Sequence, residues 1–141
     1  MKLNKNENFL SKKCVPVNDT KWKTIKQGLH IAMVIRKDAV GIASNQLGYN
    51  HNAFVIRVKN KLIFFKNPTI KCYGNKFIHK EKCLSLSGEY KVERYSKVDI
   101  TDDINGKQTF EGYMACVIQH EYDHIKGILI KNKEIKWKNK S

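Results

Sequence analysis

The segment His120-Glu121-Tyr122-Asp123-His124 holds side chains whose types and spacing fit metal-dependent hydrolysis. On a helix, His120 and His124 project from the same face because residues four apart lie one turn from each other. Both imidazoles are therefore able to bind one metal ion, and an open position on that ion holds a water molecule and makes it more acidic. Glu121 lies beside these ligands and is the candidate acid or base for that water. The pattern predicts a metal-dependent hydrolase.

A third ligand has to come from another part of the chain. Cys83 is the leading candidate, because it lies between two strand-like segments and its thiolate binds borderline and soft divalent ions strongly. Glu134 is the acidic residue that follows the motif, but it lies beyond the expected end of the helix. The other cysteines are expected to be small buried or half-buried apolar residues: Cys14, Cys72 and Cys116.

Length and composition favour one domain over residues 1–141, with a polar lead-in at 1–13 and a short basic tail at 131–141. The 27 basic residues outnumber the 13 acidic ones, and the formal charge of +14 gives a general affinity for polyanions. Because nearly all of these residues are lysines, we favour solvated surface charge over a dedicated nucleic-acid site. With no signal sequence, no paired CxxC and no run of about 20 apolar residues, we expect a protein of the reducing cytoplasm that does not enter membranes.

The hydrophobic pattern predicts an α+β fold, in which short antiparallel strands pack around a central helix that carries the HExxH motif. That helix is expected to begin near Thr109 and to end at Gly127. An earlier amphipathic helix is expected from Asp19 or Thr20 to about Lys37, after an irregular lead-in. A small-residue segment at 39–48 is expected to be extended and then to turn. The expected strands are Ala53–Val58 and Leu62–Lys66, which form a hairpin, and then Ile70–Tyr73, Lys91–Arg94 and Lys97–Thr101.

Three separated segments resemble, in order, the signatures GxGxAAxQ, EGCLS and QHExDHxxG of the peptide deformylase family. The third signature is complete in Gln119–Gly127. The second is Glu81–Ser85, with Lys82 in the place of glycine, and the first is Ala39–Gln46, with alanine in the place of its first glycine. The resemblance extends over roughly residues 14–130.

The resemblance implies that Cys83, His120 and His124 hold one metal ion. Family members use Fe2+, and the same ligand set accepts Zn2+, Ni2+ or Co2+. The implied reaction is hydrolysis of the N-formyl group from the initiator methionine of nascent polypeptides, with release of formate.

The resemblance also assigns roles to residues around the metal. It implies that Glu121 is the general base and then the general acid, taking a proton from water and delivering one to the leaving amine. Gln46 and the backbone N–H of Leu84 are implied to stabilise the oxyanion, because donors lower the barrier when they point at developing negative charge.

For the substrate, the resemblance implies an extended peptide that pairs with the main chain of Val40-Gly41-Ile42. The methionine side chain is expected in an apolar pocket near Val40, Val117 and His120. Lys82 puts a long cation at the rim of this site, where it is expected either to point to solvent or to affect peptide binding.

The implied partners are formyl-methionyl nascent peptides in a bacterial cytoplasm, and the short lysine-rich chain suits a phage-borne member in an infected host. We expect a monomer without a membrane or specific DNA partner. The positive charge is expected to attract ribosomal RNA in a salt-dependent manner.

Two other classes of function stay open on the sequence alone. An HExxH peptidase that cleaves internal amide bonds would share the metal and Glu121, although Gln46 and Cys83 argue against it. A basic ribosome-associated or RNA-associated module with a structural metal would explain the charge but not the open-site residues. A catalytically inactive relative is a further alternative because of Ala39 and Lys82.

Overall fold

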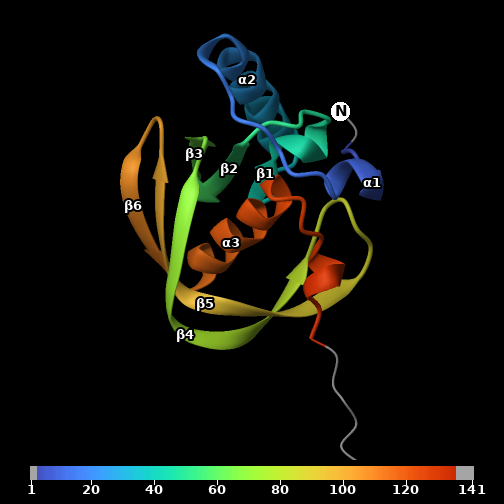
Figure 1. The fold of residues 1–141 in the computed structure, drawn as a ribbon, viewed down its shortest axis with the longest axis vertical. Coiled ribbons are helices and arrows are strands. Elements are labelled where there is room, and N and C mark those ends of the chain that lie inside the picture. The colour runs from blue at the N-terminus through green and yellow to red at the C-terminus, as the bar shows by residue number, and fades with distance from the viewer. Residues whose placement is uncertain (1–2, 136–141) are drawn as a thin grey trace, which may run out of the picture.

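Residues 3–135 are described by a computed structural model, in which the helix α3 lies between two antiparallel sheets (Figure 1). The first sheet has the order β1-β2-β3, with β1 at Gly41–Ala43, β2 at Ala53–Val58 and β3 at Lys61–Lys66. The second has the order β4-β5-β6, with β4 at Thr69–Lys82, β5 at Glu89–Asp102 and β6 at Gly106–Glu111. Helix α3, at Tyr113–Ile125, packs against both sheets. The predicted α+β class is confirmed.

The first sheet separates two hydrophobic clusters because successive side chains of a strand point to opposite faces. On one face, Ala43, Phe54 and Ile56 pack with the apolar side of α3. On the other face, Ile42 and Val55 pack beneath α2, which runs from Asp19 to Ile35. The buried side of α2 carries the residues that the helical pattern predicted: Ile25, Leu29, Ala32 and Met33. Sheet one is therefore covered on both faces.

The capping of α2 differs by one residue from the prediction. Asn18 is the N-cap, and its side chain accepts a hydrogen bond from the N–H of Lys21 at 2.8 Å. Asp19 and Thr20, the predicted caps, lie in the first turn. An asparagine satisfies a free helix N–H as well as they would, so spacing alone does not select among the three.

The segment at 39–48 extends and turns as predicted, through β1 and the 3-10 helix η1 at Ser44–Leu47. The predicted hairpin is also present, with Lys59 (φ 49°) and Asn60 (φ 67°) forming its two-residue turn. Two successive positive φ angles match the right-handed twist of the flanking strands. Strand β3 therefore begins at Lys61, one residue earlier than predicted.

The prediction was wrong about residues 109–112, which were expected to begin the helix. Thr109 belongs to β6, where it lies opposite Asp99 of β5, and α3 begins only at Tyr113. Gly112, with φ 63°, redirects the chain between the two elements. Phe110 packs against the core from β6. An apolar residue that faces the core fits the pattern of a strand and of a helix equally well. The strands β4 and β5 are also longer, at 14 residues each, than the short segments predicted.

The lead-in at residues 1–13 was predicted to be irregular, but part of it is helical. A short helix, α1, spans Glu7–Leu10; Asn6 caps it by accepting from the N–H of Phe9, and Leu10 is fully buried. The predicted end of α3 is confirmed, since α3 stops at Ile125 and Gly127 adopts φ 73°.

After α3 the chain forms a second 3-10 helix, η2, at Ile130–Lys133. Ile130 packs against Cys83 and Val92, and the N–H of Ile135 donates to the carbonyl of Lys91 at 2.8 Å. The predicted basic tail thus begins as an ordered segment on β5, and its residues 136–141 lie outside the described part of the chain.

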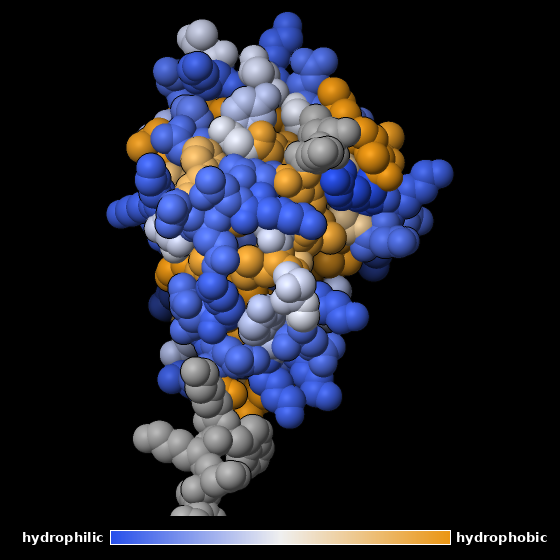
Figure 2. All heavy atoms as spheres, turned by 90° about the vertical axis from the view of Figure 1, so that its right-hand side faces the viewer, coloured by the Kyte–Doolittle hydropathy of each residue, from blue (hydrophilic) through white to orange (hydrophobic). Residues whose placement is uncertain are grey.

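The surface reflects the lysine-rich composition. Figure 2 shows one face that is mostly hydrophilic and is broken by smaller hydrophobic areas. Between residues 3 and 135, no helix is both long and apolar enough to span a lipid bilayer.

Gly127→Ala tests the packing of the lead-in on the end of α3. A Cβ at Gly127 would meet the carbonyl oxygen of Ser11 at 2.5 Å, in addition to the strain of φ +73°. We expect a loss of about 2–5 kcal/mol in the free energy of unfolding, measured with urea. Gly106→Ala is the control, because Gly106 has φ +69° but open space around it, and it should cost only about 1–2 kcal/mol. Equal losses in the two variants would refute the packing argument.

Candidate metal centre

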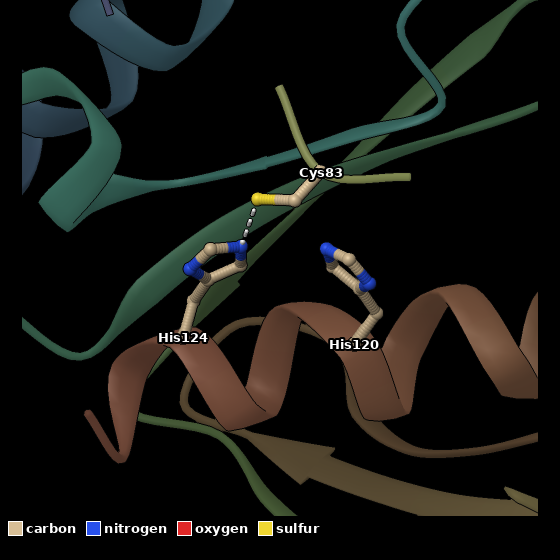
Figure 3. Close-up of side chains that lie close together, drawn as sticks. All are labelled: Cys83, His120 and His124. Atoms are coloured by element: carbon tan, nitrogen blue, oxygen red, sulfur yellow. Dashed lines mark hydrogen bonds between the residues drawn. The ribbon is translucent and has the colours of Figure 1, made fainter. Parts of the chain in front are cut away.

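Cys83, His120 and His124 converge on one point beneath the first sheet. Their ligand atoms all lie within 4.8 Å of one another, and the Sγ of Cys83 lies 3.2 Å from Nε2 of His124. Figure 3 shows the two imidazoles rising from the same face of α3 toward the cysteine. Cys83 and His124 are buried, and His120 is half-buried. The prediction that two ligands one turn apart meet a distant cysteine is matched by this geometry.

The chemistry of this trio fits a transition metal. One thiol and two imidazoles are the soft and borderline donors that bind Zn2+, Fe2+, Co2+ or Ni2+ rather than Mg2+ or Ca2+. Burial lowers the pKa of His124 well below its usual value, so its imidazole is neutral and able to act as a ligand. Three protein ligands leave a tetrahedral ion with an open position, as in catalytic sites. Glu134 is not among the ligand atoms that converge here.

Glu81 orients His120 from behind. Its Oε1 lies 2.8 Å from Nδ1 of His120, which leaves Nε2 of that ring to face Cys83 and His124. Glu81 also receives two hydrogen bonds from Arg94, from Nε at 2.8 Å and from Nη2 at 2.7 Å. A carboxylate that holds the far nitrogen of a ligand histidine fixes both the tautomer and the direction of the ring.

Arg94 joins this carboxylate to the helix and to the C-terminal segment. It is 1% exposed, and its Nη1 donates to Asp123 of α3 at 2.6 Å. Lys133 of η2 contacts the same Asp123 at 3.0 Å. Burial alone would raise the pKa of Glu81, but the hydrogen bonds from Arg94 and His120 outweigh it and hold that pKa far below the usual range. Glu81 is therefore ionised.

Glu121 lies on the helix between the two histidine ligands and packs against β1. It is 4% exposed, and its Oε1 has no hydrogen-bond partner among the described residues. Burial raises the pKa of Glu121 to about 7, against the opposing charge of His120. A Cβ at Gly41 would lie 2.8 Å from Oε2 of Glu121, so only glycine leaves room for this carboxylate.

Gln46 and Leu84 both lie beside Cys83 and line the pocket. The Oε1 of Gln46 accepts from the N–H of Ala43 at 2.9 Å, and its Nε2 donates to Ser85 at 3.1 Å and points at the Sγ of Cys83 at 3.9 Å. The N–H of Leu84 has no hydrogen-bond partner within residues 3–135. Both groups are donors beside the metal ligands.

A pocket of about 290 Å³ opens in front of Glu121 and His120. Residues 38–41 and residues 79–82 line this pocket, together with Val117 of α3. Val40 is 39% exposed at this pocket, whereas Ile42 is fully buried and does not line it. The side chain of Ile42 therefore takes no part in the pocket wall.

Several residues at this site were not assigned a role from the sequence. Glu81 belongs to a recognised motif and Arg94 is one of only three arginines in the chain, but neither feature reveals that the two pair. The side chain of Asn45 donates to the carbonyl of His124 at 2.6 Å and ties η1 to the end of α3.

The remaining cysteines take no part in the centre, and their predicted burial is confirmed. Cys14 and Cys116 are buried and Cys72 is half-buried. Burial raises the pKa of both Cys14 and Cys116 to about 11, so their thiols stay protonated and act as small apolar groups.

Comparison with known proteins decides the family. Residues 3–140 match the sequence model of the family described as polypeptide deformylase. This chain belongs to the polypeptide deformylase family. Peptide deformylase 1 of Clostridium perfringens (strain 13 / Type A) is 34% identical over 92% of this chain and 93% of its own length.

Solved deformylases share the fold. Peptide deformylase from Plasmodium falciparum superposes with a TM-score of 0.83 at 28% identity, covering 96% of this chain and 87% of that one. Peptide deformylase from Thermotoga maritima has a TM-score of 0.77 at 29% identity, covering 91% of this chain and 92% of that one. The family match favours a deformylase over the internal peptidase and the RNA-associated module.

Arg94→Met tests the ion network of this deformylase. Removing the guanidinium takes two hydrogen bonds from the buried Glu81 and one from the half-buried Asp123, so the free energy of unfolding should fall by about 3–5 kcal/mol. Metal affinity should fall about 10-fold to 100-fold because His120 loses its fixed orientation. Urea unfolding and competition with a chelator measure the two effects.

Lys97→Gln is the control for that variant. Lys97 pairs with Glu111 at 3.8 Å, but the two side chains are 45% and 68% exposed. Such a surface pair contributes only about 0–1 kcal/mol. A loss in Arg94→Met no larger than in Lys97→Gln would contradict the role given to the network.

Proposed function

We propose that this deformylase removes the N-formyl group from the formyl-methionyl end of nascent polypeptides and releases formate. The observation that carries the proposal is the position of Glu121, a buried carboxylate with a free oxygen beside three convergent metal ligands and a pocket. The formyl group is the smallest acyl group, so it requires little space beyond the metal itself.

Cys83, His120 and His124 are the proposed ligands of the catalytic ion. Such an ion supplies Lewis acidity, which lowers the pKa of water and polarises a carbonyl oxygen. We propose Fe2+ as the native metal, and the donor set also supports binding of Zn2+, Ni2+ or Co2+. The ionised Glu81 supports this assignment because it directs one nitrogen of His120 toward the other two ligands.

Glu121 is the proposed carrier of the proton. Its carboxylate accepts a proton from the attacking water and then delivers one to the amine nitrogen as the C–N bond breaks. The pKa of about 7 that burial gives this group suits both roles near neutral pH. Gly41 supports the role sterically, because its missing side chain leaves the carboxylate room to lie against β1.

Gln46 and Leu84 are the proposed donors to the oxyanion. The amide Nε2 of Gln46 is held in direction by the bond that its own Oε1 accepts from Ala43. The free N–H of Leu84 is the second donor. Donors that are already oriented cost no reorganisation when negative charge develops on the carbonyl oxygen.

The peptide is proposed to lie as an added strand between two sheet edges. Strand β1 ends the first sheet and β4 ends the second, and residues of both line the pocket. The backbone of Val40-Gly41-Ile42 supplies main-chain pairing, and Val40 and Val117 supply the apolar contact for the methionine side chain.

The setting of this activity follows from the family and the charge. We propose a monomeric cytoplasmic protein, organised as one domain, that meets nascent chains near the ribosome. The formal charge of +14 supports electrostatic attraction to ribosomal RNA. We also propose a phage origin, on the lysine-rich composition of the chain.

Formate release from a formyl-Met-Ala-Ser peptide tests the function directly. The protein is purified without oxygen, loaded with Fe2+, Ni2+ or Zn2+, and compared with Glu121→Ala. We expect Glu121→Ala to keep its metal but to lose turnover by a factor of about 10² to 10⁴, because only the proton carrier is removed. Cys83→Ala and His124→Ala should instead lose the metal. Full turnover in Glu121→Ala would refute the mechanism.

Gln46→Met tests the oxyanion donor. Methionine has a similar length but no N–H, so kcat should fall by about 10² to 10³ while metal content is unchanged. Gln119→Met is the matched control, because the amide of Gln119 is also buried but bonds the backbone of Tyr95 outside the pocket. This control should lower the melting temperature, because it removes buried hydrogen bonds. Its kcat should stay within about twofold of that of the unchanged protein. A similar kcat in the two variants would exclude Gln46 as a donor.

A further inference from the structure

Two lysines of β4, Lys80 and Lys82, line the pocket. Strand β4 is the outermost strand of its sheet, and its residues 79–82 border the pocket. Lys80 and Lys82 are both exposed, and neither forms an ion pair with any residue between 3 and 135. Lying two apart on one strand, they share a face and are spaced by about 6–7 Å.

The neighbouring strand does not neutralise this pair. Lys80 lies opposite Lys91 of β5, and Lys82 lies opposite Glu89. Like charges directly opposite each other on one face are unfavourable. On this face Lys80, Lys82 and Lys91 lie near two carboxylates, Glu89 and Glu93, and Glu93 is already paired with Lys76 at 3.6 Å.

The other acidic residues at the pocket do not remove the excess positive charge from β4. Glu81 points to the opposite face of the strand, where Arg94 and His120 bind its carboxylate. Asp38 is exposed and also lines the pocket, outside β4. The pocket thus has a cationic wall on β4, formed by Lys80 and Lys82, and one exposed acidic residue, Asp38, elsewhere in its lining.

We propose that Lys80 and Lys82 make this deformylase select peptides with acidic side chains after the formyl-methionine. The proposal rests on the proposed function, since it needs an extended peptide along the free edge of β4. A strand added there places every second side chain on the face that carries the two lysines. A carboxylate at such a position forms a cross-strand pair with Lys80 or Lys82 and offsets the repulsion between Lys80 and Lys91.

Alternation along the peptide distinguishes this selection from general attraction to a protein of charge +14. A local pair acts only at alternate positions of the peptide, because the intervening side chains point to the other face. Attraction by the net charge acts at every position and falls steeply as salt is added.

The experiment moves a single glutamate along formyl-Met-Ala-Ala-Ala-Ala-Ser, one alanine position at a time, with lysine as the matched replacement. The values of kcat/KM are measured with the metal-loaded protein. We expect glutamate to exceed lysine by about twofold to fivefold per pair at alternate positions, and by little at the positions between them. The all-alanine peptide reports the deformylase activity itself.

Lys80→Gln combined with Lys82→Gln should abolish the glutamate preference while the all-alanine peptide is still hydrolysed. Lys12→Gln combined with Lys13→Gln removes the same charge from exposed residues away from the pocket, and it should keep the preference. Asp38→Asn should not weaken the preference, because it removes the opposing charge.

Binding of the same peptides without the formyl group is measured by fluorescence anisotropy. It compares glutamate with lysine at each position in the absence of turnover. Hydrolysis of the all-alanine peptide without any alternating preference for glutamate would overturn this inference and leave the proposed function intact. A preference that is equal at all positions, or that Lys12→Gln with Lys13→Gln also removes, would overturn it as well. Absence of all turnover beside an alternating preference in binding would refute the proposed function but support the cationic wall.

Discussion

The buried guanidinium of Arg94 is the constraint on which the metal centre depends. A charged side chain that is 1% exposed is tolerated only where opposite charges and hydrogen bonds replace its hydration. Here Glu81 accepts two hydrogen bonds from Arg94, and Asp123 accepts a third. These bonds fix β4, β5 and α3 relative to one another, and through Glu81 they also fix the ring of His120. The geometry of the metal ligands is therefore linked to the packing of the second sheet.

The first sheet contributes the other side of the centre through close backbone approach. Gly41 has no side chain, so β1 lies directly against the carboxylate of Glu121. The η1 turn that follows places Gln46 next to Cys83 and ties Asn45 to the end of α3. A buried carboxylate in this position has a raised pKa because water is largely excluded from it. The same packing thus sets both the position and the protonation of the proposed acid and base.

The fold was predictable from the sequence where the local pattern was compatible with only one kind of secondary structure. The period of α2, the hairpin at Lys59-Asn60 and the stop at Gly127 follow from hydrophobic spacing and turn residues, and all three are present. Residues 109–112 were misread as the start of α3 because Phe110 suits either a strand or the start of a helix. Pairing with β5 decides between them, and such pairing depends on residues about ten positions away in the sequence. The helix α1 was missed because a four-residue helix leaves too short a pattern.

For the site, the sequence by itself determined the donor atoms and their relation along one helix. The i, i+4 spacing of His120 and His124 fixes a shared face on any helix, and the motif of Glu81–Ser85 marks Cys83. Only the tertiary structure decided that Cys83 reaches the histidines, that Glu81 and Arg94 stand behind His120, and that Lys80 joins Lys82 at the pocket. The reason is physical: helix geometry is local, whereas contacts between β4, β5 and α3 arise from how two sheets bury their faces against one helix.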